Sequence, residues 1–209
     1  MKKRALLLGI NEENYSVVIR KAADFLRRGK VIIYPTETSY GLGASAKNRK
    51  AIEKIHAIKK QPRNKAISII VSSIASAKKF GKISKNAEKL VKKFMPGPLT
   101  LIVGKRKAVP KELSKKGIAF RISSNKIAND LCKSLGTGIT ATSANLHGKK
   151  AVYSGKKVIR EFANKVDLII DHGNLPKRKE STLYDVEKGK VLRKGPVKEK
   201  EIEKVLRKR

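Results

Sequence analysis

Short apolar runs and helical apolar stripes alternate along the chain. In the segment from Ser16 to Arg28 the apolar residues fall on one helical face, and Gly29 follows at the position where glycine commonly ends a helix. Val31 to Tyr34 is a continuous apolar run that predicts a buried strand. Similar patterns predict further helices at about 48–58, 73–80, 84–94, 125–135, 154–164 and 198–207. They predict further strands at 66–71, 99–103, 118–122, 138–142, 167–171, 181–186 and 190–193.

The order of these elements indicates the fold class. Strands and helices interleave without a strict strand-helix alternation, which predicts an α/β fold with one curved β-sheet of mixed direction, covered by helices. No internal repeat or low-complexity segment interrupts the pattern, and the one linker-like piece, 173–180, is too short and too late in the chain to divide domains. We therefore expect a single domain over residues 1–209.

The charge of the chain is strongly positive. It contains 51 Lys and Arg against 17 Asp and Glu, a formal net charge of +34. Such a field attracts polyanions, including nucleotides and RNA. The basic residues are nevertheless spread along the whole length, and lysine-rich surfaces are also common in hyperthermophile proteins. The charge alone therefore leaves contact with RNA and a general lysine bias as equal alternatives.

The apolar runs are too short for a membrane span, which needs roughly 20 apolar residues. The N-terminal segment is basic but has an apolar stretch of only six residues, which does not predict a signal peptide. A single cysteine, Cys132, excludes an intramolecular disulfide, and its helical pattern predicts a small buried residue. We expect a cytoplasmic protein without membrane contact.

The segment from Tyr34 to Gly43, with the sequence YPTETSYGLG, carries the densest group of candidate binding residues. The predicted strand ends at Pro35, and hydroxyls, one carboxylate, one phenol and two glycines follow. This composition predicts a binding loop at the end of a buried strand. Tyr40 has two interpretations, as a wall of the cleft or as a buried residue packed under the loop.

Several familiar motifs are absent or weak. The segment from Gly41 to Ala46 satisfies a loose dinucleotide-binding fingerprint, but it lies six residues from the strand end and lacks the acidic residue that the motif requires further on. The sequence contains no P-loop and no paired cysteines. His56, His147 and His172 lack metal-ligand spacing, so we expect structural or solvent-exposed roles for them and no protein metal site.

Polar residues remain at the ends of several predicted strands. Ligands of open α/β sheets bind where such ends converge, and cations among hydroxyls and amides favour an anionic ligand. These residues are Thr36, Thr38, Lys59, Arg121, Thr140, Thr142, Ser143, Asn145, Ser181 and Arg193. Each also has a plain structural interpretation, such as a turn residue for Thr36 or a helix-end cation for Lys59.

Taken together, the motifs resemble those of the threonylcarbamoyl-AMP synthase family. The resemblance implies the fold of that family, which is called YrdC-like or YrdC/RibB-like. PTETSYGLG resembles its P-T-[DE]-T-x-Y-G-L loop. The remaining matches follow in the family's order: Met95 to Thr100 (P-G-P-x-T), Ala119 to Arg121 (V-x-R), Thr142 to Asn145 (S-A-N), Ser181-Thr182 (S-T) and Leu192 to Gly195 (L-R-x-G). The resemblance covers about 16–205, the expected core, and is closest to the short, single-domain form of the family.

The resemblance implies a reaction in which ATP, bicarbonate and L-threonine give threonylcarbamoyl-AMP and pyrophosphate, for tRNA threonylcarbamoyladenosine modification. It implies Mg²⁺ accompanying ATP and a downstream threonylcarbamoyl transferase as recipient of the product. The implied catalytic residues are Lys59, Ser143 and Asn145. The implied ATP contacts are Lys59, Arg63, Ser143, Asn145 and Arg193, and the implied threonine contacts are Thr36, Arg121 and Ser181, with Arg121 pairing bidentately with the carboxylate.

Two positions depart from the family pattern: Gln61, and Ala66, which replaces a proline usually found there. Gln61 stands where the K-x-R segment has its arginine, so one phosphate-binding charge is missing, and Lys60, Arg63 or Lys65 could replace it. The alternative function is an RNA-binding module that keeps the fold with weak or lost synthase activity. A carbamoyl-transfer protein of the hydrogenase-maturation type would need acyl-phosphatase and zinc-finger domains, for which this chain has neither the length nor the cysteines.

Overall fold

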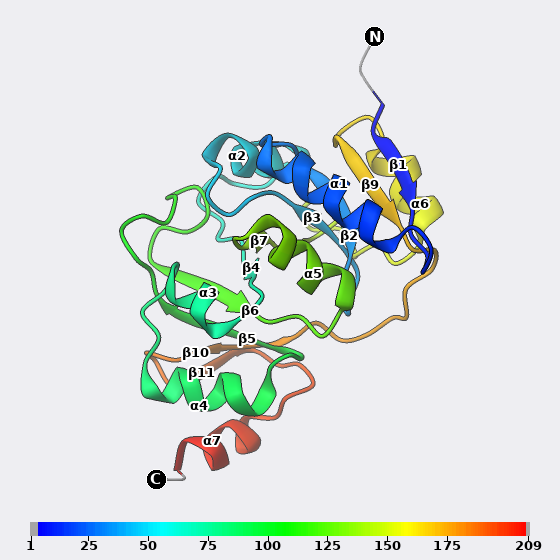
Figure 1. Cartoon of the computed structure of the whole chain (residues 1–209). Helices are drawn as coiled ribbons and strands as arrows, with labels where there is room; N and C mark the ends of the chain where they lie inside the picture. Colours follow the sequence, from blue (N-terminus) through cyan, green and yellow to red (C-terminus); the bar gives the residue numbers. More distant parts are fainter. Residues whose placement is uncertain (1–3, 208–209) are drawn as a thin grey trace.

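The computed structural model describes residues 4–207 and contains two β-sheets with helices packed against them (Figure 1). The first sheet has the strand order β1-β9-β2-β3-β8 and the second β11-β10-β5-β6-β4-β7. The helices are α1 (Tyr15–Arg27), α2 (Arg49–Lys59), α3 (Ile74–Lys78), α4 (Lys85–Phe94), α5 (Lys126–Leu135), α6 (Gly155–Phe162) and α7 (Glu199–Arg207). The predicted mixed α/β fold is confirmed, and the helices lie within two residues of their predicted bounds.

The first sheet consists of β1 (Leu6–Gly9), β9 (Leu168–Asp171), β2 (Ile32–Pro35), β3 (Tyr40–Gly43) and β8 (Thr142–Ser143). Strands β1 and β2 flank β9 in parallel, whereas β3 pairs antiparallel with both β2 and β8. The second sheet consists of β11 (Lys190–Arg193), β10 (Thr182–Asp185), β5 (Leu99–Gly104), β6 (Gly117–Arg121), β4 (Ile69–Ile70) and β7 (Ile139–Thr140). Its parallel pairs are β10 with β5 and β4 with β6, and its other pairs are antiparallel.

The two sheets meet at a bent segment, where a single strand over 138–142 was expected. Strand β7 belongs to the second sheet and β8 to the first, and Ala141 lies between them. The backbone N–H of Ala141 donates to Ser68 O at 2.7 Å, while that of Thr140 donates to Ala44 O at 2.9 Å. The chain therefore passes from one sheet to the other at Ala141, and the expectation of one curved sheet is replaced by two joined sheets.

Two strands are not predicted by the apolar pattern. Strand β1 lies before residue 16, where the expected core begins, and its backbone bonds go to β9, which is more than 150 residues away. Strand β3 falls inside the segment that we expected to be a loop, because Tyr40–Gly43 is half glycine. It forms a hairpin with β2 in which Pro35 pairs with Tyr40. The binding segment is therefore a short hairpin turn over 36–39. The expectation of a single domain stays a prediction.

Helix starts follow capping chemistry. Asn48 accepts a hydrogen bond from Ala51 N, and Ser73, Ser84 and Asn125 cap α3, α4 and α5 in the same way. Helix α2 ends at Lys60, whose φ of 51° is left-handed. This reversal turns the chain directly after Lys59 and leads it into the segment 61–66.

The inner strands β2 and β3 of the first sheet are buried on both faces. Successive residues of β2 enter different apolar clusters: Ile33 packs with α2, and Ile32 packs with α1 and α5. This accounts for the unbroken apolar run in β2. Figure 1 shows α1 and α5 side by side, with α1 on the first sheet and α5 where the two sheets meet, and at the other end of the molecule α4 packs against the second sheet and α7 against α4. Cys132 is buried in α5, as predicted, and burial raises the pKa of its thiol to about 12.

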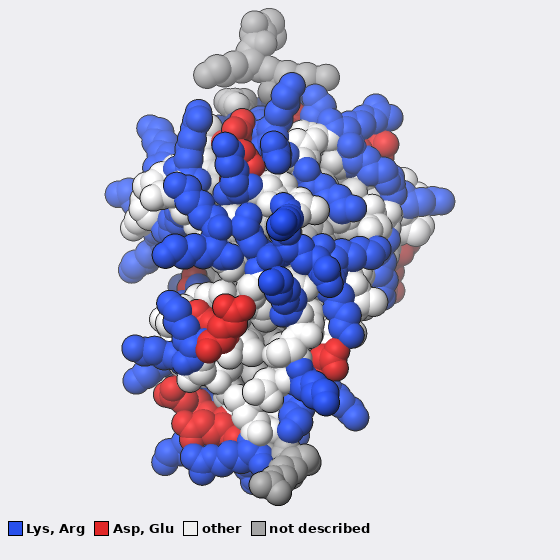
Figure 2. Space-filling model, turned by 90° about the vertical axis from the view of Figure 1, so that its left-hand side faces the viewer, with Lys and Arg blue, Asp and Glu red and all other residues white. Residues whose placement is uncertain are grey.

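Positive charge dominates the surface. Figure 2 shows one face on which Lys and Arg side chains spread over much of the upper part, while Asp and Glu appear in a few separate places in both halves. Within residues 4–207, no helix combines the length and the apolar character that crossing a membrane requires.

Candidate functional site

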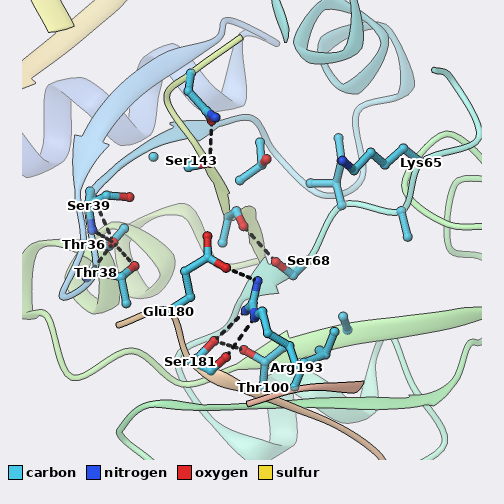
Figure 3. Close-up of a pocket in the computed structure, with 18 of the residues that line it drawn as sticks. Thr36, Thr38, Ser39, Lys65, Ser68, Thr100, Ser143, Glu180, Ser181 and Arg193 are labelled. Carbon is cyan, nitrogen blue, oxygen red and sulfur yellow. Dashed lines mark hydrogen bonds and ion pairs between the residues drawn. The ribbon is translucent and has the colours of Figure 1, made fainter. Parts of the chain in front are cut away.

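A cavity of about 480 Å³ is lined by residues of both sheets and of the loops between them (Figure 3). The hairpin turn 36–39, the end of α2, the segment 65–68, strands β5, β6 and β8, and the segment 180–183 all contribute. Its titratable lining residues are Lys59, Lys65, Arg121, His147, Glu180 and Arg193. Cations outnumber carboxylates in this set, so the cavity suits an anionic ligand.

The Thr36 hydroxyl stabilises the hairpin turn. Its Oγ1 donates to Ser39 O at 2.7 Å and accepts from the backbone N–H groups of Thr38 and Ser39, each at 3.3 Å. It also lies 3.1 Å from Thr38 Oγ1. These contacts agree with the structural interpretation of Thr36 as a turn residue, and its predicted threonine contact stays a prediction. Thr38 and Ser39 line the cavity beside it.

Arg121, at the end of β6, lies against a buried carboxylate. Its Nη1 is 3.2 Å from Glu37 Oε1, and both side chains are less than a tenth exposed. Ser123 Oγ donates to the other Glu37 oxygen and fixes that side chain. Among the described residues, Arg121 Nε is buried without a hydrogen-bond partner. A buried donor without a partner is costly, so Arg121 is prepared to receive an acceptor from a ligand.

Ser181 lies in a hydrogen-bonded chain that extends from β5 to β11. Its hydroxyl is 2.7 Å from Thr100 Oγ1 and accepts from Arg193 Nη2 at 3.2 Å. Arg193 Nε donates to Ser181 O, and Nη1 pairs with Glu180 at 2.7 Å. The Glu180 and Arg193 side chains are 58% and 42% exposed, so this ion pair lies at the mouth of the cavity (Figure 3).

Lys59, Ser143 and Asn145 bond to one another, and their predicted catalytic role stays a prediction. Lys59 Nζ donates to Ser143 O at 2.5 Å, to Asn145 O at 2.9 Å and to Asn145 Oδ1 at 2.8 Å. Ser143 Oγ donates to the same Oδ1 at 2.5 Å. Burial, assisted by the like charge of Lys65, lowers the pKa of Lys59 to about 8, while Glu180 acts weakly in the opposite direction.

Gln61 is buried and held by a histidine. Gln61 Nε2 lies 3.1 Å from His56 Nδ1, and His56 Nε2 lies 2.8 Å from Glu112 O. A carbonyl only accepts, so Nε2 of a neutral His56 carries the proton and its Nδ1 accepts from Gln61. This bond confirms the structural role expected for His56 and leaves Gln61 neutral in the cavity wall.

The cavity brings together all of the predicted site residues except Arg63, which is exposed and outside the lining. Two further candidates also turn away from it. The Tyr40 hydroxyl donates to Gly173 O at 2.8 Å, and that of Thr140 donates to Leu42 O at 3.0 Å while accepting from Ala44 N. Of the two interpretations of Tyr40, the structure supports the buried one.

Several lining residues were not predicted. Ser68 and Glu180 line the cavity although no motif or strand end singled them out, and Ser39, Lys65 and Thr100 line it without an assigned role. The sequence could have indicated Ser68 and Thr100, because each is a hydroxyl residue in an otherwise apolar predicted strand. Glu180 lies in the segment that we interpreted as linker-like.

Metal ligands do not gather in this site. Over the described part of the chain, no group of three or more His, Cys, Asp and Glu side chains could hold a metal ion. Glu37 and Glu180 are both paired with arginines. Within the described residues, the carboxylates at the cavity are therefore not free of a cation.

Known proteins are similar to this chain in both sequence and fold. A threonylcarbamoyl-AMP synthase of Pyrococcus abyssi is 35% identical over 96% of this chain and 61% of its own length. One of Thiobacillus denitrificans is 33% identical over 81% of this chain and 91% of its own length. The crystal structure of P. abyssi Sua5 complexed with L-threonine superposes with a TM-score of 0.88 at 35% identity, over 97% of this chain and 61% of that one.

The chain thus spans about three fifths of the P. abyssi protein and most of the bacterial one. A family model described as telomere recombination, which covers Sua5, YciO and YrdC proteins, matches residues 24–195. The motifs from the hairpin turn to Arg193 all fall within that match, and with them this chain belongs to the Sua5/YciO/YrdC family.

Proposed function

We propose that this protein is a threonylcarbamoyl-AMP synthase, which makes threonylcarbamoyl-AMP and pyrophosphate from ATP, L-threonine and bicarbonate. The observation that carries the proposal is one cavity with two different anion sites. All five of the following residues line the cavity. In this proposal Arg121 and Ser181 form its threonine end, and Lys59, Ser143 and Asn145 form its phosphate end. The relatives named above support the choice of substrates.

The threonine end suits an amino-acid carboxylate. Arg121 keeps a buried Nε without a partner among residues 4–207, and guanidinium binds carboxylates through parallel N–H groups. The hydroxyls of Thr38, Ser39 and Ser181 line the same region and can bond the amino-acid side chain. The ion pair with Glu37 already fixes the Arg121 guanidinium, so ligand binding does not have to order that side chain.

The chemistry requires orientation and charge more than a strong base. Threonine and bicarbonate give a carbamate with loss of water and one proton. A carbamate oxygen then attacks the α-phosphorus, the new O–P bond forms, and the bond to the bridging oxygen breaks as pyrophosphate leaves. The nucleophile is already anionic, so the protein contributes alignment and positive charge against the developing negative charge.

Magnesium would enter as MgATP. The cavity carboxylates are engaged with arginines, whereas the phosphate chain itself supplies the oxygen ligands that Mg²⁺ prefers. Lys59 and Ser143 would then face the phosphate oxygens that remain, and either residue would give up one of its present hydrogen bonds to contact them directly. Arg193 would reach the nucleotide from the opposite wall, after partial release from Glu180.

The product is a reactive mixed anhydride, so a transferase that acts on tRNA must consume it. The basic surface in Figure 2 suits contact with RNA phosphates and would favour delivery near a tRNA. We place the protein in the cytoplasm, where the buried thiol of Cys132 fits a reducing compartment.

Pyrophosphate release tests the proposal. Wild type should release pyrophosphate from MgATP only when both L-threonine and bicarbonate are present, and Gln61→Arg, which restores the family's charge, should release it at least as fast. No threonine-dependent release from either chain would reject the synthase function and favour the RNA-binding alternative.

A further inference from the structure

The four cations of the cavity are not equivalent. Arg121 and Arg193 each face a carboxylate, at 3.2 and 2.7 Å. Lys59 and Lys65 form no ion pair with any carboxylate in the part of the chain that the structure describes. The uncompensated positive charge of the cavity therefore comes from these two lysines.

Lys59 has no free donor. An ammonium carries three N–H groups, and Lys59 directs its Nζ to Ser143 O, Asn145 O and Asn145 Oδ1. A phosphate at this position would gain the charge of Lys59, but a direct hydrogen bond would first require one of these contacts to break. Gln61, beside it, adds no charge and has its amide N–H engaged with His56.

Lys65, in contrast to Lys59, keeps N–H groups that are free to donate. Among the described residues, its Nζ has one hydrogen-bond contact, to His147 Nδ1 at 3.1 Å. The ammonium can only donate, so Nδ1 accepts and the ring of His147 is neutral. Two N–H groups of Lys65 are left for a ligand. The side chain is exposed and lines the cavity, on the side away from the Thr36 turn (Figure 3).

The backbone places Lys65 and His147 together. Lys65 N donates to Pro62 O at 3.0 Å, and this turn brings Lys65 back to the cavity while Lys60 and Arg63 stay outside its lining. His147 N donates to Lys59 O at 2.8 Å, so the backbone of His147 is tied to the end of α2. The field of Lys65 also reaches Lys59, because it contributes to the lowered pKa of that lysine.

We propose that Lys65, held by His147, binds the phosphate chain of the nucleotide and supplies the positive charge that Gln61 lacks. An anion between Lys59 and Lys65 removes the repulsion between two like charges that have no carboxylate of their own. His147 acts as a positioning residue, since its Nδ1 directs the ammonium without neutralising it. This inference rests on the proposed function and extends it to residues that replace the family's arginine.

The test measures the affinity of MgATP, and of AMP as a probe without the outer phosphates, by isothermal titration calorimetry. Lys65→Met should weaken MgATP binding at least about 10-fold, as expected for a charge-assisted bond, and should leave AMP binding unchanged. The matched control is Lys50→Met, which removes the same charge from an exposed position in α2 outside the cavity lining. Equal MgATP affinity in the two variants would overturn the inference.

Two further variants separate positioning from folding. His147→Ala should weaken MgATP binding, and His147→Asn, which keeps an acceptor for the ammonium, should recover most of the loss. Adding Gln61→Arg to Lys65→Met should restore affinity by returning the charge at the neighbouring position. Failure of both rescues would contradict the proposal. A wild-type chain that does not bind MgATP would overturn the proposed function as well, whereas normal wild-type binding with an unaffected Lys65→Met would overturn the inference alone.

Discussion

The proposed threonine end and the proposed phosphate end of the cavity hold their charges in different ways. At the threonine end Arg121 is buried against Glu37, which Ser123 fixes in turn. At the phosphate end Lys59 is bonded only to neutral oxygens, and Lys65 is exposed. The first arrangement is rigid and nearly neutral, and it suits one small ligand of fixed shape. The second keeps net positive charge, which suits a polyphosphate that must bind and then leave in two pieces.

The largest effect is expected at the buried pair. Arg121→Gln should destabilise the protein by about 3–5 kcal/mol, because it leaves the Glu37 carboxylate buried without its cation. It should also abolish threonine binding. Chemical denaturation and calorimetry measure the two losses.

The double variant Arg121→Gln with Glu37→Gln separates the loss of stability from the loss of threonine binding. It removes both charges, so stability should largely return while threonine binding stays absent. If threonine still binds to the double variant, the guanidinium is not the carboxylate contact, and the comparison between the two ends is wrong.

Backbone packing behind the threonine end gives the next effect. A Cβ at Gly195 would lie 2.3 Å from Thr182 N and 2.5 Å from Glu180 O, so the segment that carries Ser181 would have to move. Gly195→Ala should cost about 1–3 kcal/mol of stability, as overpacking commonly does, and should weaken threonine binding. Gly9→Ala is the control, since nothing lies within 4 Å of its added Cβ. Equal unfolding midpoints for the two variants would contradict this packing.

The phosphate end should respond to pH. Burial lowers the pKa of Lys59 to about 8, so its charge is present below that pH and is lost above it. MgATP affinity should therefore fall by about 10-fold between about pH 7 and about pH 9, while threonine affinity at the paired Arg121 stays constant. The effect on stability has the opposite sign. The pKa of Lys59 is lower in the folded protein than in the unfolded chain, so the unfolded chain keeps this proton to higher pH. The free energy of unfolding therefore increases as the pH rises through 8. If the affinities for MgATP and for threonine changed with pH in the same way, the proposed difference between the two ends of the cavity would be wrong.

The smallest effect concerns the exposed pair at the mouth. Glu180→Gln should free Arg193 for the nucleotide and tighten MgATP binding by about 2- to 5-fold, in keeping with the low strength of exposed ion pairs. Weaker binding in this variant would assign Glu180 a direct role in holding a substrate.

Local pattern was enough to predict most of the fold. Periodicity and capping residues such as Asn48 and Ser84 located the helices, because those signals lie within a few residues of the element itself. Strands β1 and β3 were missed, since a short segment or a glycine-rich one becomes a strand only through partners distant in sequence. The bend at Ala141, where one segment serves two sheets, likewise depends on contacts with Ser68 and Ala44.

Motif order was enough to identify most of the cavity residues, but not their contacts. Nothing in the sequence indicates that Glu37 pairs with Arg121, that Arg193 divides its bonds between Ser181 and Glu180, or that His147 reaches Lys65. Each of these contacts joins residues of separate elements. The choice among Lys60, Arg63 and Lys65 was open in the sequence for the same reason, and the turn at Pro62 decides which of them faces the cavity.

The most direct test of the central claim is to follow carbon from labelled bicarbonate. The protein is incubated with MgATP, L-threonine and ¹³C-bicarbonate, and the nucleotide fraction is analysed at once by mass spectrometry. The account predicts an adenylate that carries both the threonine mass and the ¹³C label, which is absent when threonine is omitted and absent from Arg121→Gln with Glu37→Gln. An unlabelled threonyl adenylate, or no threonine-dependent adenylate at all, would contradict it.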